Sequence, residues 1–206
     1  MSERRFLEAS AKARTADTVR GVERATAVEV VVTVRHRAAR HFLTSIVFGV
    51  GCAALGFLVM WFGPREYDVR TMPLDVAISL VLGVAVCAAM PGLRRVLTPK
   101  KSLRASAERA AKAAFTALGI DKTRGRTGLL VYVALFERTA VLVPDSGLAQ
   151  PGLAVALAAV GEKLAGAVGH LDLEGFLAAL AGLGPTCAVT LPRQSDDENE
   201  LCDDVV

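Results

Sequence analysis

The stretch Leu43–Phe62 reads LTSIVFGVGCAALGFLVMWF and holds no charged side chain. A second uncharged stretch, Val76–Leu93, reads VAISLVLGVAVCAAMPGL and follows after a short polar segment. An α-helix rises about 1.5 Å per residue, so about twenty residues cross the roughly 30 Å of bilayer hydrocarbon. Thr71 to Leu74 give the second stretch further reach, because Pro73 is tolerated in the first turn of a helix. The pattern predicts a two-helix transmembrane hairpin with spans at about 43–62 and 72–93.

Basic residues lie on the outer sides of this pair. The loop Gly63–Thr71 between the two stretches balances two Arg with one Glu and one Asp. The positive-inside rule then places both large flanks in the cytoplasm, as in an integral protein of a bacterial inner membrane. We expect anionic lipid headgroups, rather than nucleic acid, beside this excess charge, because no aromatic-and-basic stripe accompanies it. The expected headgroup contacts are Arg94, Arg95, Lys100 and Lys101.

The composition suits an integral protein with one modest domain. The chain has 206 residues, of which 52% are apolar and 22% are charged. Buried helices of soluble proteins are usually shorter than eighteen residues, which favours the membrane interpretation. We expect no signal peptide, because more than forty residues that include many charges precede the first apolar stretch.

Outside the hairpin, the periodicity predicts helices and strands in alternation. The valines at 28, 30, 32 and 34 recur with period two, which is typical of a strand with one face on the core. The run Leu129–Phe136 is almost continuously apolar, which predicts a central strand buried on both faces. The predicted order is helix 4–25, strand 27–35, helix 102–118 ended by Gly119, strands 129–136 and 139–143, helices 153–168 and 173–183, and strand 187–191.

This order predicts an α/β sandwich in two pieces, 1–36 and 102–191. The first two strands would be parallel, joined by a crossover that includes a helix. The hairpin region, 37–101, is inserted in that crossover, which costs little closure entropy because loop cost grows logarithmically with length. The segment 192–206 holds six acidic residues against one Arg, and we expect a solvated tail with room for a short docking motif.

The segment Ala107–Gly147 resembles the TPM domain family. The likeness rests on the helix that ends at Gly119 and Ile120, on Gly128 before the central strand, and on Asp145 and Gly147 after the returning strand. The segments 22–34 and 191–206 are also similar to the family. The resemblance implies an α/β sandwich with a mixed sheet of about four strands, often attached to a membrane. Some members of the family are phosphatases, and others are accessory factors for membrane complexes.

The chain departs from the enzyme-associated pattern directly before Gly128. Members with that pattern have an acidic residue and Asn there, whereas this chain has Arg126 and Thr127. The loss of a carboxylate argues against metal binding and phosphatase chemistry. Weak catalytic candidates are Asp121, Glu137 and Asp145, with Arg124, Arg126 or Arg138 as phosphate partners, although all of them fit turn positions better.

No other motif indicates chemistry or a cofactor. The chain lacks a phosphate loop, a nucleophile elbow and a zinc-protease motif, and its four cysteines include no C-x-x-C pair, so we expect reduced thiols, no zinc and no cofactor. Small residues four apart could join the two spans or two copies of the chain. These pairs are Gly49 with Ala53, Gly83 with Cys87, and Ala85 with Ala89.

The sequence therefore favours a membrane protein whose cytoplasmic TPM-like domain is a non-catalytic interaction or accessory module with an unidentified membrane-protein partner. Two alternatives stay open: a metal-dependent phosphatase of the TPM type, and a structural anchor that forms homo-oligomers.

Overall fold

The computed structural model describes residues 3–64 and 67–193, which fall into two compact units. An α/β unit combines the residues up to Ala39 with those from Arg104 onward. A helical unit comprises Arg40–Leu103. The helical unit is thus inserted between two parts of the chain that fold together.

The helical unit contains α3 (Phe42–Phe62), α4 (Met72–Ala89) and α5 (Pro91–Leu97), and it includes the first residues of α6 (Lys100–Ala117). The α/β unit contains three strands, six α-helices and two short 3-10 helices among its described residues. Besides the rest of α6, these are α1 (Arg4–Leu7), α2 (Ala9–Ala25), β1 (Glu29–Arg35), η1 (Ile120–Lys122), β2 (Gly128–Ala134), β3 (Thr139–Pro144), η2 (Ser146–Leu148), α7 (Pro151–His170), α8 (Leu173–Ala181) and α9 (Leu183–Ala188).

The three strands form one mixed sheet in the order β1-β2-β3. β1 and β2 are parallel, from the pair Glu29 and Gly128 to the pair Arg35 and Ala134. β2 and β3 are antiparallel neighbours joined by a four-residue turn, Leu135 to Arg138. Every residue of β2 is buried. The predicted parallel crossover, the strand hairpin and the central place of the Leu129 run are therefore confirmed.

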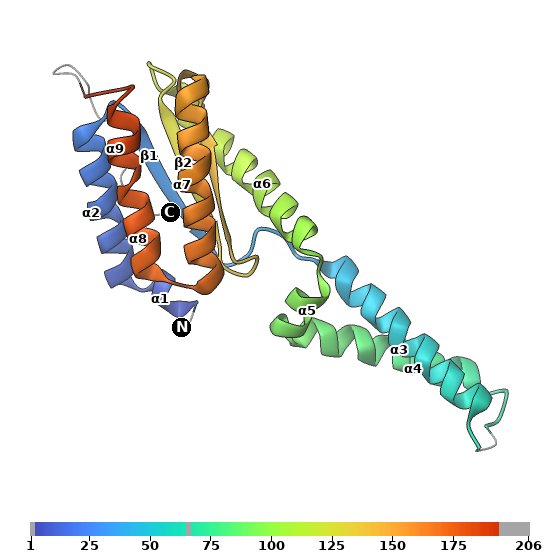
Figure 1. Cartoon of the computed structure of the whole chain (residues 1–206). Helices are drawn as coiled ribbons and strands as arrows, with labels where there is room; N and C mark the ends of the chain where they lie inside the picture. Colours follow the sequence, from blue (N-terminus) through green and yellow to red (C-terminus); the bar gives the residue numbers. More distant parts are fainter. Residues whose placement is uncertain (1–2, 65–66, 194–206) are drawn as a thin grey trace. The chain divides into compact units, whose positions relative to one another are not determined.

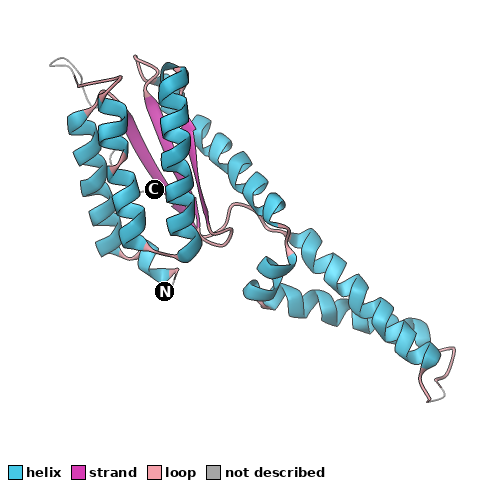
Figure 2. Ribbon diagram, in the orientation of Figure 1, coloured by secondary structure: helices cyan, strands magenta, loops and turns pink. Residues whose placement is uncertain are grey.

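Helices cover both faces of the sheet (Figures 1 and 2). The side chains of Val30, Val32 and Val131 pack in one cluster with residues of α2, α7, α8 and α9. On the other face, Leu130 and Tyr132 pack with residues of α6. The alternation seen in the sequence of β1 thus directs its even-numbered valines toward the thicker helical layer.

The predicted fourth strand, Cys187–Leu191, is wrong. Gly182 has helical backbone angles (φ −61°, ψ −15°), so the chain continues from α8 into α9 and stays helical to Ala188. Leu183 and Cys187 are four residues apart, and both are fully buried in the helical layer. That spacing is the helical period, and it outweighs the strand propensity of Val189 and Thr190.

A carboxylate, rather than a strand, contacts the free edge of β1. Glu23, on α2, is buried, and its Oε1 accepts the backbone N–H of Val30 at 3.0 Å. Just before β1, Thr26 forms an isolated antiparallel bridge with Pro192, in which the N–H of Ala27 donates to the carbonyl of Leu191. The buried carboxylate thus accepts one of the outward backbone N–H groups that a fourth strand would otherwise bind.

Two of the predicted helices have other bounds in the structure, because the backbone conformation at Glu8 and Met90 is not helical. The predicted helix 4–25 is divided at Glu8, whose backbone is extended. The second apolar helix begins at Met72 and ends at Ala89 rather than Leu93, because Pro91 disfavours the helical conformation of Met90. Gly119 ends α6 as expected, with a left-handed φ of 68°.

Cys187 offers a check of the helical C-terminal segment. Burial raises the pKa of its thiol to about 11. A neutral buried thiol stabilises the fold fully below pH 9, the ordinary value, and this contribution falls as the pH rises toward 11, because the unfolded chain is then favoured by ionisation. We expect the melting temperature of the chain, relative to a Cys187→Ala variant, to fall between pH 9 and pH 11. Circular dichroism of the detergent-solubilised chain measures it, and a constant difference would contradict the burial.

Candidate functional site

Large apolar side chains of the helical unit point outward. Trp61 is 65% exposed and Phe62 is 78% exposed on α3, and Val81 is 64% exposed on α4. Both helices combine length with high hydropathy, and little of either is buried within the protein. Water around so much apolar surface is unfavourable, and an exposed patch of this kind marks contact with lipid or protein.

Small residues occupy the contact between α3 and α4. Gly49 and Ala53 are buried on α3, and Gly83 and Cys87 are buried on α4. A Cβ atom built on Gly83 would lie 2.9 Å from the Cα of Gly49 and 2.9 Å from the Cβ of Cys52. Two of the small-residue pairs expected from the sequence thus bring the helices together, while Ala85 and Ala89 are exposed.

Among the described residues, α7 is a third helix that is long and apolar enough to cross a membrane. Many of its large apolar side chains are buried, whereas those of α3 are exposed. Leu157, Leu164 and Val168 are buried in the cluster on one face of the sheet. We therefore assign α7 to the core of the α/β unit.

The four basic residues expected at lipid headgroups follow α4 within the helical unit. Lys100 and Lys101 are exposed, and Arg95 is partly buried. Arg94 is only 7% exposed, so its side chain does not contribute to the charged surface. The basic surface therefore rests on three of the four residues.

The three acids considered for catalysis lie at opposite ends of the sheet. Asp121 in η1 and Asp145 after β3 lie at the end where β2 begins, whereas Glu137 lies in the turn after β2. The seven residues of β2 make that separation about 20 Å. No single reaction centre can use all three carboxylates.

Glu137 holds a loop in place. Its side chain is buried, and its two oxygens accept the backbone N–H groups of Ala38 at 3.1 Å and Ala39 at 3.3 Å. Ala38 and Ala39 belong to the segment that follows β1. Ala38 precedes Glu137 by ninety-nine positions in the chain. The carboxylate thereby fixes the exit of β1 to the strand hairpin.

Arg126 brings Asp121 and Asp145 together. Its Nη1 donates to the backbone carbonyl of Asp121 at 2.9 Å and lies 3.7 Å from Oδ1 of Asp145. Asp145 is buried and also accepts the N–H of Ser146 at 2.6 Å, which starts η2. Arg126 thus places a positive charge beside the buried carboxylate of Asp145.

Three buried side-chain oxygens at this end of the sheet lack a hydrogen-bond partner among the described residues: Oδ1 of Asp121, Oγ1 of Thr123 and Oδ2 of Asp145. Such oxygens are suited to bind a cation. However, nowhere in residues 3–64 and 67–193 do three His, Cys, Asp or Glu residues gather as a metal site. With the guanidinium of Arg126 already beside Asp145, the residues present fit a divalent metal poorly.

Two of the residues that shape these regions were missed in the sequence. Glu23 and Thr123 are both polar residues in or near helices, where a polar side chain is ordinarily solvated. Only the fold reveals that they are buried. The sequence held one signal for the burial of Glu23. This charged residue follows Val22 and lies on a face of α2 that is otherwise small and apolar.

Comparison with known proteins supports the fold. No family model matches the chain, and no curated protein sequence matches it. The NMR structure of BA42 protein from the psychrophilic bacterium Bizionia argentinensis is similar, with a TM-score of 0.58 and 17% sequence identity. The match covers 99% of this chain and 97% of that chain. At this identity the likeness shows a shared fold and nothing about activity.

Gly83 tests the close approach of α3 and α4. A Gly83→Leu variant places four carbons where the Cβ alone would meet α3, and we expect a destabilisation of about 1–3 kcal/mol from overpacking. Ala85→Leu is the matched control, because Ala85 is exposed two residues away on the same helix. The melting temperature in detergent micelles measures both variants. Equal melting temperatures for the two variants would contradict the observed packing.

Glu137 can be tested as a positioning residue of the fold. Glu137→Ala leaves two backbone N–H groups without their acceptor, at a cost of about 1–3 kcal/mol. We expect faster amide hydrogen exchange at Ala38 and Ala39, and a smaller effect for Glu137→Gln, which keeps one acceptor oxygen. Unchanged exchange at both amides in the alanine variant would show that the carboxylate does not fix this loop.

Proposed function

We propose that the chain is an integral membrane protein in which α3 and α4 form a transmembrane hairpin that anchors a TPM-like domain. The observation that carries the proposal is the distribution of side-chain sizes in the helical unit. Small residues face inward and large apolar residues face outward, the reverse of a soluble helical hairpin. Lipid is the solvent in which that arrangement is favourable.

The charges on either side of the hairpin support an orientation. Lys100, Lys101 and the partly buried Arg95 follow α4, and Arg35, Arg37 and Arg40 precede α3. The positive-inside rule then puts the α/β unit in the cytoplasm, with the loop after α3 on the far side. Anionic headgroups are the proposed partners of Lys100 and Lys101.

The domain itself is proposed to act by binding, as an accessory module for a membrane-protein partner. Glu137 holds a loop, Asp145 starts η2, and Arg126 occupies the space beside Asp145. Each of these roles is structural, and together they use the polar residues that hydrolysis of a phosphate ester would require.

A metal-dependent phosphatase is the second candidate, and it is favoured by the unpartnered oxygens of Asp121, Thr123 and Asp145. This candidate places the reaction at the start of β2, with Arg126 as the phosphate partner. It requires that Arg126 leave Asp145 when a metal ion binds.

Two exposed valines provide a matched test of the anchor and its orientation. Val69, in the loop between α3 and α4, is 76% exposed, and Val155, on α7, is 73% exposed. Each is changed to cysteine in a chain whose four native cysteines are replaced. In intact bacterial cells, a membrane-impermeant maleimide should label Val69→Cys, and it should label Val155→Cys only after lysis.

The reverse labelling pattern would overturn the orientation. Release of the chain from vesicles by alkaline carbonate would overturn membrane insertion itself, whatever the labelling shows.

Phosphatase activity has its own test on the purified chain. Hydrolysis of p-nitrophenyl phosphate is measured with Mg²⁺, Mn²⁺ or Ca²⁺, beside the variants Asp145→Asn and Glu137→Gln. We expect no metal-dependent turnover above that of the buffer. Turnover that is lost in Asp145→Asn and retained in Glu137→Gln would establish the enzyme and overturn the binding role.

A further inference from the structure

A groove of about 820 Å³ lies within the helical unit. One side of the groove is a face of α3 that extends from Leu43 to Leu55. The other side is the segment that leads from α5 into α6, with Leu97, Pro99 and Ser102 (Figure 1). Cavities of about 300–1,000 Å³ are typical of sites for small-molecule ligands, so the groove is large enough to hold one.

Hydrogen bonds hold the second side of the groove against α3. The hydroxyl oxygens of Thr44 and Thr98 lie 3.0 Å apart. Thr98 donates its own proton to the carbonyl of Arg94 at 2.7 Å, so Thr44 is the donor between the two threonines. The end of the groove near Thr44 is therefore fixed by contacts of the protein itself.

Gly51 lies midway along the α3 side of the groove. It is two positions from Gly49, which touches α4, and two positions turn an α-helix by about 200°. A Cβ atom built on Gly51 would meet no atom of another described element within 4 Å. The missing side chain thus leaves a notch between Val47 and Leu55, which are both exposed, on a face of α3 that is turned away from α4.

The groove has the depth of one lipid leaflet. α3 rises about 18 Å between Leu43 and Leu55, at 1.5 Å per residue. The hydrocarbon of one leaflet is about 15 Å thick, which is half of the bilayer core. In the proposed orientation α3 begins at the cytoplasmic surface, so the groove runs from that surface to about the middle of the bilayer.

Polar and basic residues gather at the cytoplasmic end of the groove. His41, Thr44 and Ser102 line this end, whereas the remainder of the α3 side is apolar except for one thiol. Lys100 and Lys101 directly precede Ser102 in the chain, and both are exposed. An apolar groove with a basic, hydroxyl-bearing mouth is complementary to an acyl chain that carries an anionic headgroup.

We propose that the groove binds one anionic phospholipid of the inner leaflet, with an acyl chain along α3 and the phosphate near Ser102 and Lys101. The proposal rests on the transmembrane hairpin proposed above and adds a specific ligand to it. Bulk lipid would cover every exposed face of α3 alike, whereas this site selects one face of the helix and one headgroup charge.

A helix of a second copy fits the groove less well than an acyl chain. Close contacts between membrane helices are made by small residues four positions apart. The residues four positions before and after Gly51 are Val47 and Leu55, which are both large. They hold a second helix away from the notch, but an acyl chain is thin enough to pass between them.

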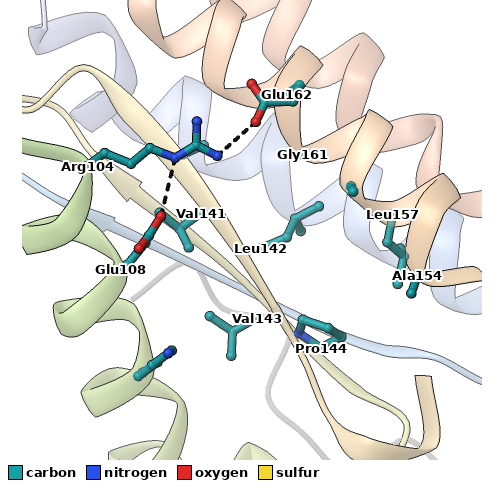
Figure 3. A pocket seen from close by; sticks show the side chains of 13 residues that line it. Arg104, Glu108, Val141, Leu142, Val143, Pro144, Ala154, Leu157, Gly161 and Glu162 are labelled. Carbon is teal, nitrogen blue, oxygen red and sulfur yellow. Dashed lines mark hydrogen bonds and ion pairs between the residues drawn. The ribbon is translucent and has the colours of Figure 1, made fainter. Parts of the chain in front are cut away.

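The groove along β3 in the α/β unit is a poorer site for a long ligand (Figure 3). Its floor is the strand from Ala140 to Pro144. Arg104 of α6 donates to Glu162 of α7 at 2.8 Å, and this ion pair crosses the groove. A long acyl chain would have to break the ion pair in order to lie along the floor.

Gly51 allows the proposed site to be blocked on the side away from α4. Gly51→Leu fills the notch, and Ala54→Leu is the matched control, because Ala54 is exposed on the same helix and does not line the groove. The full chain is placed in nanodiscs that contain phosphatidylglycerol with a photoreactive diazirine in its acyl chain, or phosphatidylcholine with the same chain. Mass spectrometry locates the adducts after illumination.

With the phosphatidylglycerol probe, we expect several-fold more adducts at Val47 and Phe48 than at Val50, which is exposed and does not line the groove. Gly51→Leu should lower the labelling of Val47 and Phe48 several-fold, because its side chain occupies the place of the acyl chain. Ala54→Leu should leave that labelling unchanged.

The headgroup is tested at the two lysines. The phosphatidylglycerol probe should label the groove several-fold more than the phosphatidylcholine probe. Lys100→Gln combined with Lys101→Gln should remove this difference, because the attraction of the basic residues for an anionic headgroup is lost. Equal labelling by both probes in the unaltered chain would overturn the choice of an anionic lipid.

Alkaline carbonate extraction separates failure of this site from failure of the anchor. If the chain stays in the membrane, even labelling around α3 or equal effects of Gly51→Leu and Ala54→Leu would overturn the lipid site alone. Release of the chain would overturn the anchor and the site together. Disulfide-linked dimers of Gly51→Cys, in a chain whose native cysteines are replaced, would overturn the site in favour of a second copy.

Discussion

The parallel pairing of β1 with β2 is the constraint on which the rest of the chain depends. Two parallel neighbours cannot be joined by a turn, so the chain must return along the full length of the sheet before β2 begins. α6 makes that return, and it can lie close to the sheet because Ala107 and Ala111 on its inner face are small and fully buried. The helical unit is inserted in the same connection and ends within the first turn of α6. An insertion there leaves every strand pair intact, and its length adds little to the entropy of closing the loop.

The strands could be predicted where a single side-chain period dominates. The valines of β1 alternate, which indicates a strand with one face on the core. The run in β2 is apolar throughout, which indicates a strand that is buried on both faces. The C-terminal segment fails for the opposite reason. Val189 and Thr190 favour a strand locally, but Leu183 and Cys187 are already packed at helical spacing against the helices of the same layer. The packing of a long-range cluster outweighs the preference of two exposed or half-exposed residues.

The polar sites could be predicted only as residue types. Asp121, Glu137 and Asp145 lie within twenty-five positions of one another in the sequence, which suggests one centre. The fold separates Glu137 from the other two by the length of β2, because a strand hairpin carries its turn to the far end of the sheet. Arg126 has a left-handed φ of 52°, and its reach to Asp145 depends on that loop conformation. Such contacts across loops have no periodic signature in the sequence.

The two edges of the sheet are treated differently, and the difference follows from their neighbours. Beside β1, α2 supplies the buried carboxylate of Glu23, and the bridge from Thr26 to Pro192 closes the approach to the strand's start. Beside β3, the helices of the two faces stand apart around small side chains, and Pro144 is the one residue of that edge that cannot donate a hydrogen bond. An open edge is a site for pairing with another segment unless something covers it. Among the described residues, the sheet therefore has one edge that is hydrogen-bonded by a buried carboxylate and one edge that no strand pairs with.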